Sequence, residues 1–273
     1  MKKLTCSSIA NVKAVLSKIS SFPKKNLGQN FLIDGNIVRK ILLEAEVKSN
    51  DYILEIGPGL GSLTEALVME GAEVLAVEKD ISFREILSYF SIEIQFIDIR
   101  DFSLFSMKRQ GKLVANLPYH ISSLVLSKFV KECNFFTDIV VMVQKEMADR
   151  IVAKPNSSDY SSLSVMLQFY SDVHYAFKVS PKCFYPIPKV SSAVVHLKLK
   201  KDYLLPIESH QLFFNMVRMA FQQRRKKLIN SLSNAFSKEK ISNSLKELGK
   251  NENVRAENLS VRDFSELFLL LKE

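Results

Sequence analysis

The sequence predicts an α/β domain built on a parallel β-sheet, followed by a small helical domain. Two observations support this fold class. Between residues 51 and 143, short apolar stretches typical of buried strands alternate with amphipathic helical stretches, and such alternation favours right-handed βαβ crossovers with helices on both faces of a sheet. Beyond about Lys201 the β-branched runs disappear, and apolar residues recur at helical spacing.

The predicted strands are short and apolar, and polar, glycine or proline residues bound them. They cover the stretches Tyr52–Ile56, Glu73–Val77, Ile92–Ile97, Leu113–Ala115 and Ile139–Val143. Helices are predicted between them, in a segment through Leu63 to Met69, from Ser82 to Tyr89 and from about Ser122 to Lys131. A further β-rich stretch, residues 190–199, is expected to return as an edge strand.

Three stretches with helical spacing make up the C-terminal region after a linker at Leu204-Leu205-Pro206, namely His210–Leu232, Lys238–Leu248 and Val261–Leu271. We therefore predict three parts. Residues 1–23 form an N-terminal extension, which we interpret as a short amphipathic or frayed segment. Residues 24–201 form the α/β domain, and residues 202–273 form the helical domain.

The composition excludes several classes of protein. With 47% hydrophobic and 25% charged residues, the chain can form a packed core and differs from disordered proteins. Its longest apolar runs are too short to span a bilayer, and polar residues near the N-terminus interrupt any signal peptide. The three cysteines form no CxxC pair and no metal-binding spacing with the four histidines, so we predict no metal site and a reducing, cytoplasmic location.

The net charge of +9 is concentrated in the C-terminal part. From Pro181 to the end there are 17 Lys and Arg against 9 Asp and Glu, whereas the first 180 residues carry 21 against 20. This asymmetry is typical of a protein whose C-terminal part binds a polyanion such as nucleic acid, and a solvated charged face on helices is the alternative interpretation.

A glycine-rich loop, Gly57-Pro58-Gly59-Leu60-Gly61, ends the first strand and opens a helix. Glycines there let the backbone turn sharply and approach a ligand closely. Glu78 ends the next strand, 21 residues beyond Gly57, where an acid can accept hydrogen bonds from both ribose hydroxyls of an adenosine-containing cofactor. The pair leaves open whether that cofactor is a nicotinamide dinucleotide or S-adenosylmethionine.

Two details favour S-adenosylmethionine. The glycines are spaced GxGxG rather than GxGxxG, and Glu55 precedes them in the sequence Glu55-Ile56-Gly57. Asp98 then ends the third predicted strand, from which its carboxylate can reach the adenine amino group of such a cofactor.

The most specific feature is Asn116-Leu117-Pro118-Tyr119, which follows the fourth strand and is therefore expected in the ligand crevice of a parallel sheet. The exocyclic amine of adenine is a poor nucleophile because its lone pair is delocalised into the ring. The Asn116 side-chain oxygen and a backbone carbonyl at Leu117 or Pro118 can hold both amine hydrogens and direct the lone pair at a sulfonium methyl. Tyr119 can stack on the base. Such catalysis depends on positioning and electrostatics rather than on a general base.

With these motifs the chain resembles the bacterial ribosomal RNA small-subunit adenine dimethyltransferases, from about Lys24 to its end. The matching strings are Asn26–Leu32, Glu55–Gly61, Asn116–Tyr119, Gln144–Glu146, Leu163–Val165, Phe184–Val190, Phe221–Lys227 and Arg255–Ser260. The resemblance implies a Rossmann-like S-adenosylmethionine-dependent methyltransferase sheet and a small C-terminal all-helical domain that binds RNA.

The resemblance also implies roles for single residues. The cofactor would be bound by Asn30, Leu32, Gly57, Glu78, Asp98 and Asn116, and Phe184 would stack on the target adenine opposite Tyr119. The implied substrate is a pair of adjacent adenosines in the loop of the hairpin near the 3′ end of 16S rRNA. The expected partner is the small ribosomal subunit during its assembly, and we expect a monomer without membrane contact.

Two positions depart from the family pattern, because His120 stands where asparagine is usual and Ser191 where aspartate is common. We interpret His120 as a packing residue of its loop rather than a catalytic base. The basic run Arg224, Arg225, Lys226 and Lys227 is expected within a helix, so that two or three of these side chains reach RNA phosphates.

Three alternatives remain at this point. A large-subunit rRNA adenine methylase of antibiotic-resistance type shares the Asn-x-Pro-Tyr chemistry, but the strings Gln29–Leu32 and Arg255–Ser260 favour the small-subunit enzyme. A non-catalytic ribosome assembly factor is less favoured, since Gly57, Glu78 and the other motif residues are intact. A dehydrogenase is the third.

Overall fold

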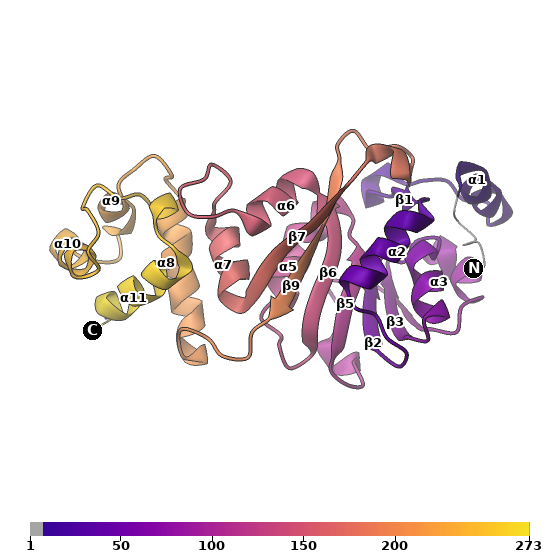
Figure 1. Cartoon of the computed structure of the whole chain (residues 1–273), viewed down its shortest axis with the longest axis horizontal. Helices are drawn as coiled ribbons and strands as arrows, with labels where there is room; N and C mark the ends of the chain where they lie inside the picture. The colour runs from indigo at the N-terminus through magenta and orange to yellow at the C-terminus, as the bar shows by residue number, and fades with distance from the viewer. Residues whose placement is uncertain (1–7, 273) are drawn as a thin grey trace. The chain divides into compact units, whose positions relative to one another are not determined.

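The computed structural model describes residues 8–272 and shows two compact units (Figure 1). The first unit runs to Ala148 and includes Val173–Leu199, and the second contains Asp149–Asp172 and the chain from Lys200 onward. The predicted division after residue 201 lies close to one point where the chain passes between units. The sequence analysis did not predict that residues 149–172 belong with the C-terminal helices.

A seven-stranded sheet forms the centre of the first unit, with the strand order β4-β3-β2-β5-β6-β9-β7. Its strands are β2 (Tyr52–Ile56), β3 (Glu73–Glu78), β4 (Glu93–Phe96), β5 (Gly111–Asn116), β6 (Phe136–Gln144), β7 (Ser171–Val179) and β9 (Ser192–Leu199). Strands β2 to β6 run parallel to one another, so their carboxyl ends lie along one edge, where such sheets bind ligands. The predicted α/β class is confirmed.

The prediction that residues 190–199 form an edge strand is wrong. β9 lies between β6 and β7, antiparallel to β6. Its residues Ala193, Val194 and Val195 are fully buried, as is typical of an interior strand. The edge position belongs to β7, which the sequence analysis did not predict because exposed and half-buried residues dominate it.

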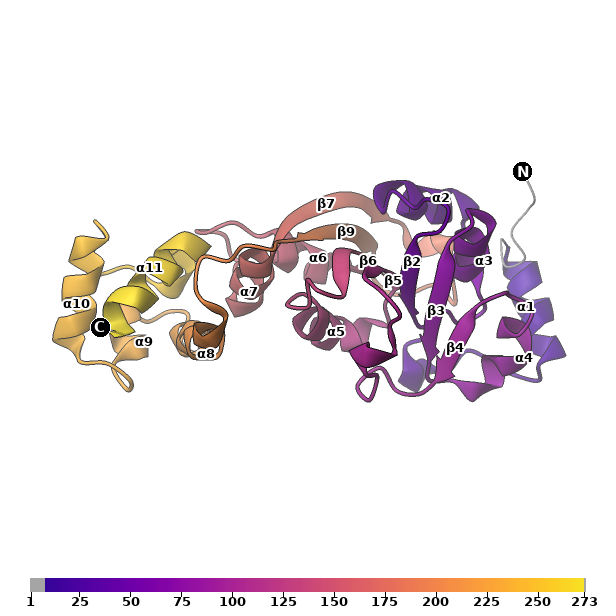
Figure 2. The same cartoon turned by 90° about the horizontal axis from the view of Figure 1, so that it is seen from below.

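Helices cover both faces of this sheet, and Figure 2 shows α2 along one face and α5 along the other. They are α2 (Gly35–Glu44), α3 (Ser62–Met69), α4 (Arg84–Leu87) and α5 (Ser122–Phe129), while α6 (Lys145–Val152) leads from the first unit into the second. Ile41 of α2 and Leu67 of α3 share one apolar core with Ile53 and Val140 of the sheet. Within residues 8–272, every helix is too short or too polar to cross a membrane.

Most of the described part of the N-terminal extension forms a helix, and residues 19–23 follow it without regular structure. Helix α1 (Ile9–Lys18) begins after Ser8, whose side chain accepts a hydrogen bond from the amide of Asn11. Val12 and Leu16 lie one helical turn apart and are buried in a second apolar cluster next to the glycine-rich loop and α4. The first seven residues of the predicted extension lie outside the described residues.

The second unit is mainly helical, which confirms the predicted small C-terminal helical part. Its helices are α7 (Ser162–Tyr170), α8 (His210–Phe221), α9 (Leu228–Leu232), α10 (Lys238–Glu247) and α11 (Val261–Lys272). Aromatic rings join them, since the ring centroids of Phe169 and Phe213 are 5.1 Å apart and those of Phe213 and Phe268 are 5.7 Å apart. These contacts explain why residues 149–172 pack with the C-terminal helices.

The predicted helix His210–Leu232 is interrupted in the structure. Residues 222–227 form a turn between α8 and α9. The interruption falls in six consecutive polar residues, which offer no apolar face to a packed helix. The amide of Leu228 donates to the carbonyl of Val254 instead of continuing α8. The basic run Arg224–Lys227 therefore lies in a turn rather than in a helix.

Candidate active site

A cavity of about 340 Å³ opens at the carboxyl ends of β2, β3 and β5 in the first unit. Segments far apart in the sequence line it, within residues 27–32, 55–63, 77–83, 97–100 and 116–124. All six predicted cofactor ligands are among the lining residues: Asn30, Leu32, Gly57, Glu78, Asp98 and Asn116. Leu117, Pro118 and Tyr119 line the same cavity. The fold thus brings the glycine-rich loop and the predicted amine-handling turn together.

The shape of the glycine-rich loop depends on its glycines. Gly57 has a φ of 68° and Gly61 a φ of 82°, in the left-handed region that residues with a Cβ rarely adopt. A Cβ at Gly61 would lie 2.3 Å from Cε2 of Phe90, so the loop also approaches its neighbour too closely for a side chain. The amide of Gly57 donates to the carbonyl of Val77, which ties the loop to β3.

Glu78 at the end of β3 holds the loop from the other side. Its carboxylate accepts hydrogen bonds from the amide of Gly59 at 3.0 Å and from the amide of Asp80 at 2.7 Å. Burial raises the pKa of Glu78 above its ordinary value, although the two amide donors act in the opposite direction. Both partners are backbone N–H groups, so the backbone fixes the carboxylate in position.

Glu55 is a second buried acid, which the sequence analysis noted only as a neighbour of the loop. Its side chain is 1% exposed and accepts a hydrogen bond of 2.6 Å from Oγ1 of Thr64. Burial raises the pKa of Glu55 to about 8, with a further contribution from the charge of Glu78. At neutral pH the carboxyl group of Glu55 is therefore mainly protonated and neutral, beneath the loop.

Asp98 differs from both of these acids, because cations surround it. Arg100 donates to its two oxygens at 3.0 and 2.7 Å, and Nζ of Lys79 lies 2.9 Å from Oδ2. The Arg100 guanidinium and then Lys79 hold the pKa of Asp98 far below its ordinary value. A ligand that binds to Asp98 has to share it with these two side chains.

The turn after β5 is anchored at several points. Nδ2 of Asn116 donates to the carbonyl of Asn30 at 3.3 Å, and the amide of Leu117 donates to the carbonyl of Met142 at 3.1 Å. The Tyr119 hydroxyl and Oγ of Ser192 are 2.8 Å apart. Burial raises the pKa of the Tyr119 hydroxyl, against the opposing hydrogen bond to Ser192. The phenol is thus neutral at pH 7, and its ring is held beside the cavity.

Phe184 does not lie with the other predicted catalytic residues. It belongs to β8 (Phe184–Tyr185), which pairs antiparallel with β1 (Phe31–Leu32) in a separate two-stranded sheet. Its ring is fully buried in the apolar core that contains Val38 and Val179, and it does not line the cavity. Its pairing partner Leu32 does line the cavity.

The basic run Arg224–Lys227 lies in the second unit, and its residues differ in their contacts. Arg224 donates to the carbonyls of Ser158 and Tyr160 at 2.6 and 3.1 Å, and it lies 3.4 Å from Oε2 of Glu257. These contacts make Arg224 a structural residue of the turn. All four residues of the run are exposed, and Arg225, Lys226 and Lys227 are in the position expected of residues that contact phosphates.

His120 is exposed and lines the cavity beside the predicted amine-handling turn. Gly28, with a φ of 66°, packs against it so closely that a Cβ at Gly28 would be 3.1 Å from Nδ1 of the imidazole. This contact agrees with a packing role for His120, since the ring rests on the N-terminal segment.

A parallel sheet with a glycine-rich loop, acids at the following strand ends and a ligand cavity between them defines a Rossmann-like methyltransferase fold. Two solved structures share it. A dimethyladenosine transferase from Plasmodium falciparum is 27% identical with a TM-score of 0.71, covering 86% of this chain and 94% of that one. The 23S rRNA methyltransferase ErmE is 25% identical with a TM-score of 0.70, covering 89% and 100%.

Sequence comparison identifies the particular family. The family described as ribosomal RNA adenine dimethylase matches residues 21–273. The "Ribosomal RNA small subunit methyltransferase A" of Chlamydia muridarum is 48% identical over 273 residues, which cover 98% of this chain and 99% of that protein. The chain belongs to the ribosomal RNA adenine dimethylase family.

Proposed function

We propose that the chain dimethylates the N6 amines of two adjacent adenosines in the loop of the 3′-terminal hairpin of 16S rRNA, with S-adenosylmethionine as methyl donor. The observation that carries the proposal is that the turn Asn116–Tyr119 opens into the same cavity as Gly57, Glu78 and Asp98. Family membership and the 48% identity with a small-subunit methyltransferase support it. In this proposal the protein acts as a cytoplasmic monomer on the small ribosomal subunit during its assembly.

The donor set of the cavity fits S-adenosylmethionine. Each oxygen of the Glu78 carboxylate accepts one backbone amide and has a second lone pair for a ribose hydroxyl. Asp98 can accept from the adenine amine. Gly57 lets the amino-acid portion of the cofactor approach the backbone, while Asn30 and Leu32 line the wall beside it. The bound cofactor supplies an electrophilic methyl group, and the remaining work belongs to the residues of this chain.

The contacts of the turn select the groups that would hold the target amine. Because Nδ2 of Asn116 donates to Asn30, Oδ1 of the same planar amide points the other way and would accept one N6 hydrogen. The carbonyl of Pro118 already accepts from the amide of Ile121 and from Oγ of Ser122, so the carbonyl of Leu117 is the better second acceptor. With both hydrogens held, the N6 lone pair would be directed at the methyl group that the bound cofactor supplies.

The target base needs a stacking partner as well as acceptors. The ring of Tyr119, held through its hydroxyl at Ser192, would supply one face for a flipped adenine. A role for Phe184 on the opposite face stays a prediction, and it requires the ring to leave the apolar core described above. Arg225, Lys226 and Lys227 would contact phosphates of the RNA, with Arg224 holding the turn that carries them.

The test is incubation of the purified chain with labelled S-adenosylmethionine and unmethylated small ribosomal subunits, followed by nucleoside analysis. We expect N6,N6-dimethyladenosine at two adjacent positions of the 3′-terminal hairpin loop. A parallel incubation with unmethylated 23S rRNA tests the large-subunit alternative, for which the fold shared with ErmE is the relevant observation. Label in 23S rRNA alone would replace the proposal, and label in neither RNA would favour a non-catalytic assembly factor.

A further inference from the structure

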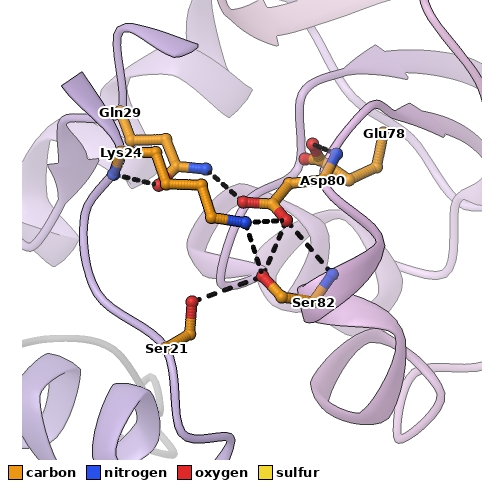
Figure 3. A network of polar contacts seen from close by, with 6 residues as sticks. All are labelled: Ser21, Lys24, Gln29, Glu78, Asp80 and Ser82. Carbon is orange, nitrogen blue, oxygen red and sulfur yellow. Dashed lines mark hydrogen bonds and ion pairs between the residues drawn. The ribbon is translucent and has the colours of Figure 1, made fainter. Parts of the chain in front are cut away.

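Asp80, a buried carboxylate at the end of β3, takes no part in the proposed chemistry. Its residue is 3% exposed and lies two positions beyond Glu78. Oδ1 of Asp80 accepts from Nζ of Lys24 at 2.6 Å and from Oγ of Ser82 at 2.7 Å, and Oδ2 accepts from Nε2 of Gln29 at 2.8 Å (Figure 3). We propose that Asp80 is a positioning residue that fixes the ribose-binding acid and the N-terminal wall of the cavity together; this role rests on the proposed function.

Asp80 makes more hydrogen bonds than are required to cap the helix that follows it. The amide of Ser82 donates to Oδ1 at 3.1 Å, and this bond alone caps the short 3₁₀ helix Ile81–Phe83. Lys24 and Gln29 come from a segment more than 50 positions earlier in the chain. Figure 3 shows both side chains reaching the carboxylate from one side, with Ser82 on the other. Asp80 therefore joins two parts of the fold.

The first part is the N-terminal wall of the cavity. Oε1 of Gln29 accepts from the amide of Lys24 at 2.8 Å, so the segment 24–29 closes on itself around the Asp80 carboxylate. The next residue is Asn30, whose carbonyl accepts from the side chain of Asn116. The position of the proposed catalytic amide thus depends on a segment that Asp80 holds.

The second part is the ribose-binding acid. The amide of Asp80 donates to Oε1 of Glu78 at 2.7 Å, while the amide of Gly59 donates to Oε2. A movement of Asp80 therefore displaces the backbone donor of Glu78 as well as the segment that leads to Asn30.

The charge of Asp80 is what recruits its partners. Burial alone would raise the pKa of Asp80, but the hydrogen bonds from Lys24, Ser82 and Gln29 hold it below its ordinary value. A buried carboxylate is tolerated only when such donors satisfy it. In an Asp80→Asn variant one oxygen becomes an NH₂ donor, so that Lys24 or Gln29 loses its acceptor.

The test compares the wild-type full chain with Asp80→Asn, Gln29→Leu and a control, Asp51→Asn. Asp51 also pairs with a lysine, since its Oδ2 lies 2.9 Å from Nζ of Lys112, but it precedes β2 at the end of the sheet away from the cavity. Hydrogen exchange of the amides of Leu27 and Gly28, which bond within the segment, is measured without cofactor. The dissociation constant for S-adenosylmethionine is then measured by calorimetry.

We expect Asp80→Asn to raise both the exchange rate of these amides and the dissociation constant about tenfold, as loss of a charge-assisted hydrogen bond predicts. Asp51→Asn should leave both unchanged. If Asp80 acts through Gln29, the double variant Gln29→Leu/Asp80→Asn binds the cofactor no more weakly than Asp80→Asn alone. Unchanged exchange in Asp80→Asn, or additive effects in the double variant, would overturn the role.

These measurements separate the inference from the proposed function. Exchange in the free protein requires neither cofactor nor RNA, so it reports on Asp80 even if wild-type protein fails to methylate small subunits. If Asp80→Asn does not fold, Gln29→Leu supplies the same test from the other partner, with exchange at Leu27 and Gly28 as the readout. Wild-type exchange rates in Gln29→Leu would then contradict the inference.

Discussion

The two halves of the cavity differ in how they use charge. The cofactor half holds three carboxyl groups with different environments. Burial raises the pKa of Glu55 to about 8 and also raises that of Glu78, whereas Arg100 and Lys79 hold that of Asp98 far below its ordinary value. The turn Asn116–Tyr119 carries only neutral side chains, fixed by hydrogen bonds to Asn30 and Ser192.

This difference indicates that cofactor binding and methyl transfer depend on different kinds of group. In the proposed function, cofactor recognition rests on carboxylates at strand ends, so it should respond to pH and to changes of charge. The proposed methyl transfer rests on fixed acceptors, so it should respond to the loss of one acceptor and little to pH.

The largest effect is expected for Asn116→Ala. Loss of the Oδ1 acceptor should lower kcat for methyl transfer by about 10³-fold, the upper range for removing one fixed hydrogen-bonding group from an active site. The dissociation constant for S-adenosylmethionine, measured by calorimetry, should change less than about threefold. Asn36→Ala, at an exposed position of α2, is the control with wild-type turnover. Near-normal turnover in Asn116→Ala would remove the amine-holding role.

Glu55 should make the stability of the fold depend on pH. Because its pKa is about 8 in the folded chain and 4.5 ordinarily, its contribution is fully present below pH 4.5 and is lost as the pH rises toward 8. Relative to Glu55→Gln, the free energy of unfolding of the wild type should fall by about 3 kcal/mol between pH 5 and 8. Urea denaturation at both pH values measures this difference, and parallel curves for the two proteins would show that Glu55 is ionised in the folded state.

Glu78 and Asp98 should respond differently to the loss of their charge. Glu78→Gln should raise the dissociation constant for S-adenosylmethionine about thirtyfold, as expected for hydrogen bonds to a charged group. Asp98→Asn should have a smaller effect, because Asp98 already shares its oxygens with Arg100 and Lys79. Titration calorimetry on both variants compares their dissociation constants. A larger effect at Asp98 would make Asp98, rather than Glu78, the main cofactor-binding acid.

The raised pKa of Glu78 also gives this comparison a pH dependence. As the pH falls into the range of this raised pKa, protonation of Glu78 removes a charged acceptor for the ribose hydroxyls, so wild-type affinity for the cofactor should decrease. Asp98 stays ionised over this range because its pKa is lowered. The same titration on Glu78→Gln should be shallower than in the wild type, and an equally steep dependence there would assign the effect to another group.

The smallest effect is expected at the basic turn of the second unit. Replacing Arg225 and Lys226 by Gln should reduce the slope of log affinity for RNA against log salt concentration by about 2, as measured by filter binding. Arg224→Gln is the informative comparison, because Arg224 bonds to the carbonyls of Ser158 and Tyr160. Arg224→Gln should lower the melting temperature, and it should change the salt slope less than the double variant does. An unchanged slope in the double variant would place the RNA contact elsewhere.

Local patterns in the sequence predicted those parts of the fold that depend on neighbouring residues. The strand Tyr52–Ile56 agrees with β2 at both ends, because a buried strand followed by Gly57 is a signal contained in a few residues. The turn Asn116–Tyr119 was predicted to open into the ligand crevice for the same reason, since the residue types and the preceding strand define it.

Features that depend on distant contacts could not be predicted in this way. Lys79 reaches Asp98 from the end of another strand, and Asp80 is satisfied by Lys24 and Gln29 across more than 50 positions. The order of β9 and β7 and the burial of Phe184 depend on how the strands assemble. The resemblance to a family located Phe184 in a motif, but the position of its ring is a property of the packed core.

The most direct test of the central claim is a crystal structure of this chain with S-adenosylmethionine bound. We predict the ribose hydroxyls on Glu78 and the sulfonium methyl directed at the turn Asn116–Tyr119, with Oδ1 of Asn116 on the side from which adenine enters. A cofactor bound outside this cavity, or an Asn116 amide turned away from the methyl group, would contradict the account.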